Sequence, residues 1–316
     1  MEKLKRILVV VLMVMVLMSG GCSSPPDINT GEVNLLITRD FGEDDIFAKD
    51  IKLDTQTSVM ELLNQHLDIE TEYGGGFVNA INGLTSGYTN TIEKEKSDWF
   101  YFINGIMTNV GATEYFPTSR DSIWWDYHSW GDIPFTPAVI GAFPQPFVNG
   151  YQGKNPGTLI LVGEGCEEWG ASLRDYLKKA GVADIEVADY QEGLAADREK
   201  ITIVLALWEE LSESNFWKGV QNHRDKTGWF AELDTDAFYS LNEKAERQNA
   251  YDEGVGAILS TGMGMGDDTP LWLLTGVDRK GLASTVEVLL DHEDRISKKF
   301  GILVTESEVI GLPVQQ

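Results

Sequence analysis

The turn from Val162 to Cys166 is the part of this sequence closest to a cofactor site or a catalytic nucleophile. Its residues, VGEGC, follow an apolar run and open a helical pattern, where a dinucleotide site would begin. The third glycine of that fingerprint is replaced by Glu168, and nearby glutamates oppose both a pyrophosphate and a Cys166 thiolate. We expect a buried structural thiol here. Since no acid, base and nucleophile fall together elsewhere, we predict a protein that is not an enzyme.

Two acidic loops are the remaining candidates for ion binding. The loop 262–268, GMGMGDD, follows an apolar strand pattern; it would line a ligand crevice, hold a cation through Asp267 and Asp268, or be a flexible crossover. A second loop starts like a calcium site at Asp234, but Phe238 occupies a ligand position. The four histidines lack metal-ligand spacing: His66, His128, His223 and His292. We therefore predict no metal and no cofactor.

An aromatic run offers a binding surface instead. Trp99, Phe100, Tyr101 and Phe102 alternate faces if they form a strand, so one pair faces a covering helix and the other faces away. We expect Trp99 and Tyr101 to face away, because their N–H and O–H groups suit a wet surface. Exposed rings of this size would form a flat ligand platform. The alternative is that the following proline-rich segment and the second half of the chain cover them.

The elements around this run predict a small α+β unit. A strand is expected over 33–38 and a helix over 57–67, where Ser58 and Glu61 form a capping box. Strands follow at 99–103, 106–110 and 123–127, and Asn104-Gly105 between the first two is typical of a type I′ turn. The order of strand, helix and hairpin predicts a β-grasp-like domain.

Three segments of this unit resemble a known family: TSVMELLNQH, GGFVNAINGL and SDWFYFINGIMTNVGATEYFPTSRDSIWWDYH. Residues 33–130 are similar to the C-terminal β-domain of transcobalamin and intrinsic factor, which also occurs in bacterial surface lipoproteins. The resemblance implies a corrinoid ligand, cobalamin or a relative, bound as cargo and not as a cofactor. It implies that Trp99, Tyr101 and Asn104 contact the ligand together with Phe77 and Asn79. The helical domain of the eukaryotic carriers has no counterpart here.

The second half reads as a separate α/β domain over 158–316. Apolar strand patterns alternate with helical ones, which favours a mostly parallel sheet. The strands are expected at 158–162, 185–188, 201–207, 257–261, 271–275 and 302–305, and the helices at 168–180, 209–222, 238–252 and 280–300. The linker 131–157 is rich in proline and glycine but also apolar, so we expect it to pack across the domains.

The first residues have the pattern of a lipoprotein signal peptide over 1–21. A basic start precedes the apolar run 7–18, which is shorter than the roughly 20 residues of a membrane span. Ser19-Gly20-Gly21-Cys22 is similar to a bacterial lipobox, with serine where leucine is usual. We expect Cys22 to carry lipid, with acyl chains such as palmitate, and 22–32 to be a tether. The protein would then be anchored on the extracytoplasmic face of the cell membrane.

Composition agrees with this location. Lipidation of Cys22 would leave Cys166 without a disulfide partner. The net charge is −25, and removing a signal peptide of charge +2 leaves about −27, which disfavours nucleic acid as a partner. Two hypotheses remain. The first is a binding lipoprotein that captures a small ligand for an importer, and the alternative is a surface module that binds proteins or wall polymers.

Overall fold

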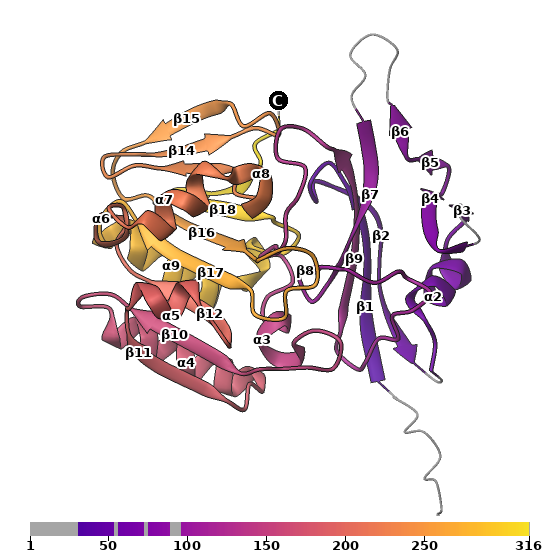
Figure 1. Cartoon of the computed structure of the whole chain (residues 1–316), viewed down its shortest axis with the longest axis horizontal. Coiled ribbons are helices and arrows are strands. Elements are labelled where there is room, and N and C mark those ends of the chain that lie inside the picture. The colour runs from indigo at the N-terminus through magenta and orange to yellow at the C-terminus, as the bar shows by residue number, and fades with distance from the viewer. Residues whose placement is uncertain (1–30, 54–55, 73–74, 89–95, 316) are drawn as a thin grey trace, which may run out of the picture.

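The computed structural model describes residues 31–53, 56–72, 75–88 and 96–315 (Figure 1). They form a mixed α/β structure with two large and two small sheets. The larger sheets, one from each half of the chain, share a continuous hydrophobic core. The predictions for residues 1–30 lie outside the described residues.

The first large sheet has the strand order β2-β1-β9-β7-β6, and β8 pairs with the end of β7. Its strands are β1 (Gly31–Arg39), β2 (Asp44–Leu53), β6 (Gly87–Tyr88), β7 (Lys96–Ile103), β8 (Ile106–Met107) and β9 (Ser122–Ser129). β1 runs parallel to β9, and the other pairs are antiparallel. The sequence did not predict β2, because this edge strand is half exposed and mixes charged with apolar residues.

A helix and a small sheet cover one face of the first sheet. The helix is α2 (Val59–His66), and the sheet consists of β3 (Ile69–Glu72), β4 (Phe77–Ile81) and β5 (Leu84–Thr85). The predicted capping box is confirmed, since Glu61 N donates to Ser58 Oγ at 3.3 Å and Ser58 N donates to the Glu61 carboxylate at 2.7 Å. The buried side of α2, with Leu62 and Leu63, packs on the sheet.

The tight turn after β7 is also confirmed. Asn104 and Gly105 both have positive φ, 53° and 79°, as a type I′ turn requires. The returning strand is shorter than predicted and ends at Met107. The outer edge of this strand pairs with the linker, where Met107 N donates to Pro137 O at 2.9 Å.

The second large sheet has the order β11-β10-β12-β17-β16-β18-β19. The strands are β10 (Thr158–Val162), β11 (Ile185–Asp189), β12 (Ile201–Leu205), β16 (Gly256–Thr261), β17 (Leu271–Gly276), β18 (Gly301–Val304) and β19 (Val309–Leu312). The first four in spatial order are parallel, and the remaining pairs are antiparallel. The expectation of a mostly parallel sheet is therefore correct for one half only. Loops too short for a crossover helix join β16 to β17 and β18 to β19.

Helices cover both faces of this second sheet. α4 (Glu167–Ala180) and α9 (Arg279–Asp291) pack on its outer face. The inner side holds α6 (Trp208–Leu211) and α7 (Asn215–Asn222), with α5 (Glu192–Ala196) and α8 (Arg224–Thr227) beside them. The helix predicted over 209–222 is split, because α6 ends at Leu211 and the Ser214 side chain caps α7 by accepting from Trp217 N. The helix predicted over 280–300 ends at Asp291, before a 3-10 turn at Glu293–Arg295.

The helix predicted over 238–252 is wrong. This segment forms the antiparallel strands β14 (Phe238–Leu241) and β15 (Arg247–Tyr251), which join β13 (Ala231–Leu233) in a small sheet. Ala245 has a φ of 56° in the connecting turn, which a helix cannot contain. Across the sheet, the Arg247 guanidinium donates to both oxygens of Glu232 at 2.6 and 2.9 Å.

The linker 131–157 lies packed between the two halves, as predicted. It contains the short helix α3 (Gln145–Asn149). Val139 N donates to Gly105 O at 2.8 Å in the first half, and Lys298 N donates to Gly141 O at 3.3 Å in the second. Val139 and Ile140 are fully buried, which explains the apolar character of a segment so rich in proline.

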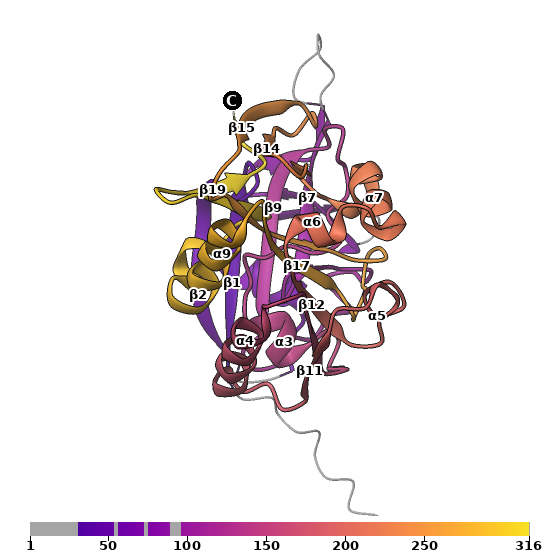
Figure 2. The ribbon, with the colours of Figure 1, turned by 90° about the vertical axis from the view of Figure 1, so that its left-hand side faces the viewer.

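The two halves meet over aromatic rings, with the first sheet behind the second in the side view (Figure 2). Phe300, before β18, makes edge contacts with Phe41, Phe102 and Trp124, with ring centroids 5.2–5.7 Å apart. His128 stacks on Phe100 at 3.9 Å. Both faces of the first sheet are therefore covered, so a ligand would have to reach it at an edge.

One buried carboxylate fixes the turn between β1 and β2. Asp126 is fully buried and accepts from the backbone N–H groups of Phe41 at 3.0 Å and Gly42 at 2.9 Å. The Thr38 hydroxyl also donates to it, and Nδ1 of His128 lies 2.6 Å from Oδ1. The carboxylate thus satisfies a turn that presents Phe41 to the second half.

Candidate ligand-binding site

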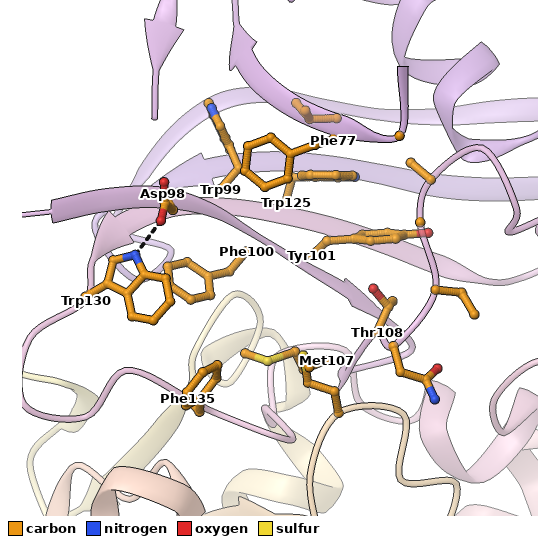
Figure 3. Close-up of a pocket in the computed structure, with 17 residues that line it drawn as sticks. Phe77, Asp98, Trp99, Phe100, Tyr101, Met107, Thr108, Trp125, Trp130 and Phe135 are labelled. Carbon is orange, nitrogen blue, oxygen red and sulfur yellow. Dashed lines mark hydrogen bonds between the residues drawn. The ribbon is translucent and has the colours of Figure 1, made fainter. Parts of the chain in front are cut away.

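A pocket of 380 Å³ lies at the outer edge of β7 (Figure 3). Its walls come from β7, β9, the start of β4, the segment 107–112 and the linker. The lining residues are Gly76, Phe77, Val78, Asp98, Trp99, Phe100, Tyr101, Met107, Thr108, Asn109, Val110, Gly111, Ala112, Trp125, Trp130, Phe135 and Met265. Phe77, Phe135 and Met265 are 40%, 38% and 54% exposed, so the rim is apolar and accessible.

The two faces of β7 contribute different rings to this pocket. Trp99 and Tyr101 lie on the side of α2, in one cluster with Leu62 and Leu63. Phe100 and Phe102 lie in the core shared with the second half. The prediction that Trp99 and Tyr101 face away from the helix is therefore wrong.

The physical reason is that polar partners exist on the covered side. Trp99 Nε1 donates to the backbone carbonyl of Leu84, in β5, at 3.0 Å. An indole N–H therefore does not need water, and Trp99 is only 7% exposed. The opposite face also excludes water, since the second half covers Phe102 completely. We predicted a flat aromatic platform on an open face of the sheet. The structure instead has aromatic rings on both covered faces of β7, and they form the two walls of a pocket at the edge of this strand.

Two polar groups in one wall have no partner among the described residues. Tyr101 and Trp125 stack with centroids 4.4 Å apart and planes 11° from parallel. The Tyr101 hydroxyl and Trp125 Nε1 make no hydrogen bond, although both side chains are more than nine-tenths buried. Burial raises the pKa of Tyr101 well above its usual value, so its hydroxyl stays neutral and can donate. Unmet groups of this kind cost about 1–3 kcal/mol each. Both atoms are fully buried in the wall, so a ligand would have to part the wall to bond them and recover part of that cost.

The opposite wall is held by a charged group. Trp130 Nε1 donates to the Asp98 carboxylate at 2.5 Å, and the Lys96 ammonium lies 4.4 Å from the Trp130 ring centroid. The same ammonium is 2.5 Å from Asp98. The charge of the Asp98 carboxylate is thus compensated by Lys96 within the wall, and the pocket remains largely apolar.

The loop 262–268 completes the rim. Asp267 accepts from Met263 N at 2.7 Å and Thr269 N at 3.0 Å, and forms a buried ion pair with Arg198 at 2.8 Å. The Asp267 carboxylate thus makes its hydrogen bonds and its ion pair within the protein. Gly266 N donates to Met107 O at 2.7 Å, which fixes the loop against β8 and places Met265 at the pocket. Of the alternatives for this loop, the structure matches a crevice-lining segment.

The pocket brings together three of the residues singled out from the sequence, Phe77, Trp99 and Tyr101. Asn79 and Asn104 are not among its lining residues. The Asn104 side chain donates to Asp121 and to Gly150 O, and accepts from Ser122 N, all within 2.9 Å. Cys22 lies outside the described residues, and its lipidation stays a prediction.

Sequence reasoning missed Met107, Trp125, Phe135 and Met265 as wall residues. They come from four separate segments, so periodicity within one segment could not group them. The glycine-rich loop was the one available signal, since its place after a strand indicated a crevice.

The remaining chemistry candidates give no assembled centre. Cys166 is buried at the start of α4, and burial raises the pKa of its thiol, with the Arg279 guanidinium opposing that shift. Among the described residues, no three histidine, cysteine or acidic side chains gather as a metal site would require. In the same residues, no helix has the length and apolar character needed to cross a bilayer.

Comparison with known proteins finds one family model and solved structures that are similar to part of the chain. Residues 56–129 match the model of a family described as "Domain of unknown function (DUF4430)". No curated protein matches. Haptocorrin in complex with Cbi is similar at 12% identity and a TM-score of 0.27, over 34% of this chain and 28% of the haptocorrin chain.

A second solved structure, described as a "putative metal binding protein" from Ruminococcus gnavus ATCC 29149, is similar at 15% identity and a TM-score of 0.24. The similarity covers 31% of this chain and 97% of that one. The chain thus spans about a quarter of the haptocorrin chain and nearly all of the Ruminococcus protein. The residues that match the DUF4430 model contain β7, its turn and β9.

Proposed function

We propose that this protein binds a small, largely apolar ligand in the pocket at the edge of β7. The observation that carries the proposal is the pair of unpartnered polar groups, Tyr101 Oη and Trp125 Nε1, within an aromatic wall. Binding sites of this kind combine apolar walls with a few directional polar groups. A ligand with a flat apolar body and a hydrogen-bonding rim would satisfy both.

A corrinoid such as cobalamin is the ligand we propose. Its macrocycle is a flat plate, and its rim carries amides that can accept from Trp125 Nε1 and exchange hydrogen bonds with the Tyr101 hydroxyl. The pocket volume of 380 Å³ is near the lower end of the 300–1,000 Å³ usual for ligand sites. We therefore expect one edge of the macrocycle to enter between the walls and the rest to lie on Phe77 and Phe135.

The cellular role follows from the first residues of the sequence. With Cys22 lipidated, the protein would hold its ligand at the extracytoplasmic face of the cell membrane and pass it to an importer. The alternative, a surface module that binds proteins or wall polymers, is favoured by one observation. Met263 is 82% exposed beside Met265 and Phe135, as in surfaces that bind other chains.

The test is calorimetric titration of cobalamin into the full chain, with Tyr101→Phe and Trp125→Phe as variants. Each removes one polar group and keeps an aromatic ring. We expect wild-type binding and a loss of about tenfold or more in each variant. Tyr88→Phe is the matched control, because Tyr88 is 70% exposed and outside the pocket lining. Absence of wild-type binding would exclude the corrinoid, and equal affinity in all variants would exclude this pocket.

A further inference from the structure

We propose that the free edge of β7 accepts an extended peptide from another protein as an additional β-strand. This inference goes beyond the proposed function: it uses the same pocket but assigns it a second ligand class, recognised through the backbone. The closing experiment separates failure of one from failure of the other.

The hydrogen-bond pattern shows which groups of β7 point outward. Trp130 N donates to Lys96 O and Asn104 N donates to Ser122 O, both at 2.8 Å, across the antiparallel pair with β9. Bonding residues alternate along an antiparallel strand, so the even-numbered residues of β7 bond to β9. The N–H and C=O groups of the odd-numbered residues therefore face the other edge.

Neighbouring strands occupy the two ends of that edge but not its middle. Ser97 is paired with β6, and Ile103 is paired with β8. Between them, Tyr101 O accepts from Thr108 N at 3.0 Å. In the part of the chain that the structure describes, no partner lies on the Trp99 N–H, the Trp99 C=O or the Tyr101 N–H.

These three groups are unusual because they are enclosed. Trp99 and Tyr101 are 7% and 8% exposed, and both line the pocket. Buried backbone groups are almost always paired, and exposed edges are usually blunted by charge, proline or a bulge. Here the unpaired groups lie in an apolar groove. They belong to Trp99 and Tyr101, which are two positions apart and so face the same edge of the strand. An incoming peptide would supply the matching C=O, N–H and C=O.

The pocket walls suit the side chains of such a strand. In Figure 3, Phe77, Trp99 and Trp125 lie on one side of β7, and Trp130, Phe135 and Met107 lie on the other. A strand added in the plane of a sheet sends its side chains alternately to the two sides. Apolar side chains of the peptide would therefore contact aromatic rings on both sides.

A hollow that adjoins the groove adds charge complementarity. The pocket continues, through the shared residues Met107, Phe135 and Met265, into a hollow of 270 Å³ lined also by Lys226. The Lys226 ammonium makes no ion pair with any residue in the described ranges. In a protein of net charge −25, an unpaired cation beside an apolar groove favours a carboxylate there. The occupant is thus a short apolar peptide with an acidic side chain or its C-terminal carboxylate in the hollow beside Lys226.

The first experiment screens the full chain against a library of acetylated pentapeptides. The first four positions are varied without proline, and glutamate is fixed at the fifth, with free-acid and amide C-termini compared. The tightest peptide is then resynthesised with one N-methyl group at each position in turn. Because one amide N–H of the added strand would donate to Trp99 C=O, methylation should cost about tenfold or more at that position and little at the positions on either side of it.

A direct measurement follows the protein. The Trp99 and Tyr101 amides should gain hydrogen-exchange protection when the peptide binds, and Lys226→Gln should weaken the glutamate peptide but not its glutamine counterpart. No library binder, an N-methyl series in which no position shows such a loss, or unchanged exchange at both amides would each overturn the peptide proposal. Cobalamin titration of the same sample is an independent test. Peptide binding without cobalamin binding would refute only the corrinoid proposal. Cobalamin binding without peptide binding would refute only the proposal of an added strand.

Discussion

The substitution Asp126→Asn tests the link between the two halves of the molecule. The carboxylate accepts from two buried backbone N–H groups, those of Phe41 and Gly42, one on each oxygen. Asparagine has the same shape but a single carbonyl oxygen. Whichever way its amide turns, at least one of these N–H groups then faces an NH₂ group.

An unmet buried donor costs about 1–3 kcal/mol, so Asp126→Asn should lower the free energy of unfolding by at least that amount. This is a large share of the roughly 5–15 kcal/mol typical of a folded protein. Urea denaturation at neutral pH measures it. Asp50→Asn is the matched control on β2, since Asp50 is exposed and should change stability by less than about 0.5 kcal/mol. If Asp126→Asn cost as little as this control, the turn would not depend on the carboxylate.

Three further predictions concern the turn, the faces of β7 and the anchor. Gly105→Val should cost about 1–3 kcal/mol by urea denaturation, because φ is +79° and a Cβ would lie 2.7 Å from Val139 O; a change below about 0.5 kcal/mol would contradict this. Trp99→Ala and Phe102→Ala should each cost about 3–5 kcal/mol in the same assay, because both faces are covered, and a stable variant would show that its face is open. Cys22→Ser should leave the protein uncleaved or move it from the membrane fraction to the medium, and processed protein retained in the membrane fraction would refute lipidation.

Local chemistry made several elements predictable. Ser58 with Glu61, and Asn104 with Gly105, adopt the predicted cap and turn because short-range hydrogen bonds and allowed φ angles decide both. The strand 158–162 was placed at its observed bounds because buried parallel strands form continuous apolar runs.

The errors arose where distant contacts decide the structure. Nothing near Trp99 in sequence reveals that Leu84 O receives its indole N–H, so the faces of β7 were assigned the wrong way round. The hairpin 238–251 was predicted as a helix because its spacing fits both structures, and it is the pairing with β13 that selects the strand. The pocket likewise depends on Phe135 and Met265, which tertiary packing alone brings to β7.

The distribution of tryptophan gives the molecule a built-in optical report. Of its nine tryptophans, Trp99, Trp125 and Trp130 line the pocket, whereas Trp217, Trp229 and Trp272 are fully buried in the second half. Emission from the pocket indoles should respond to an occupant at constant temperature, whereas the buried indoles should shift to longer wavelength only on unfolding. A single intrinsic fluorescence experiment can therefore separate occupancy from loss of structure, without any attached dye.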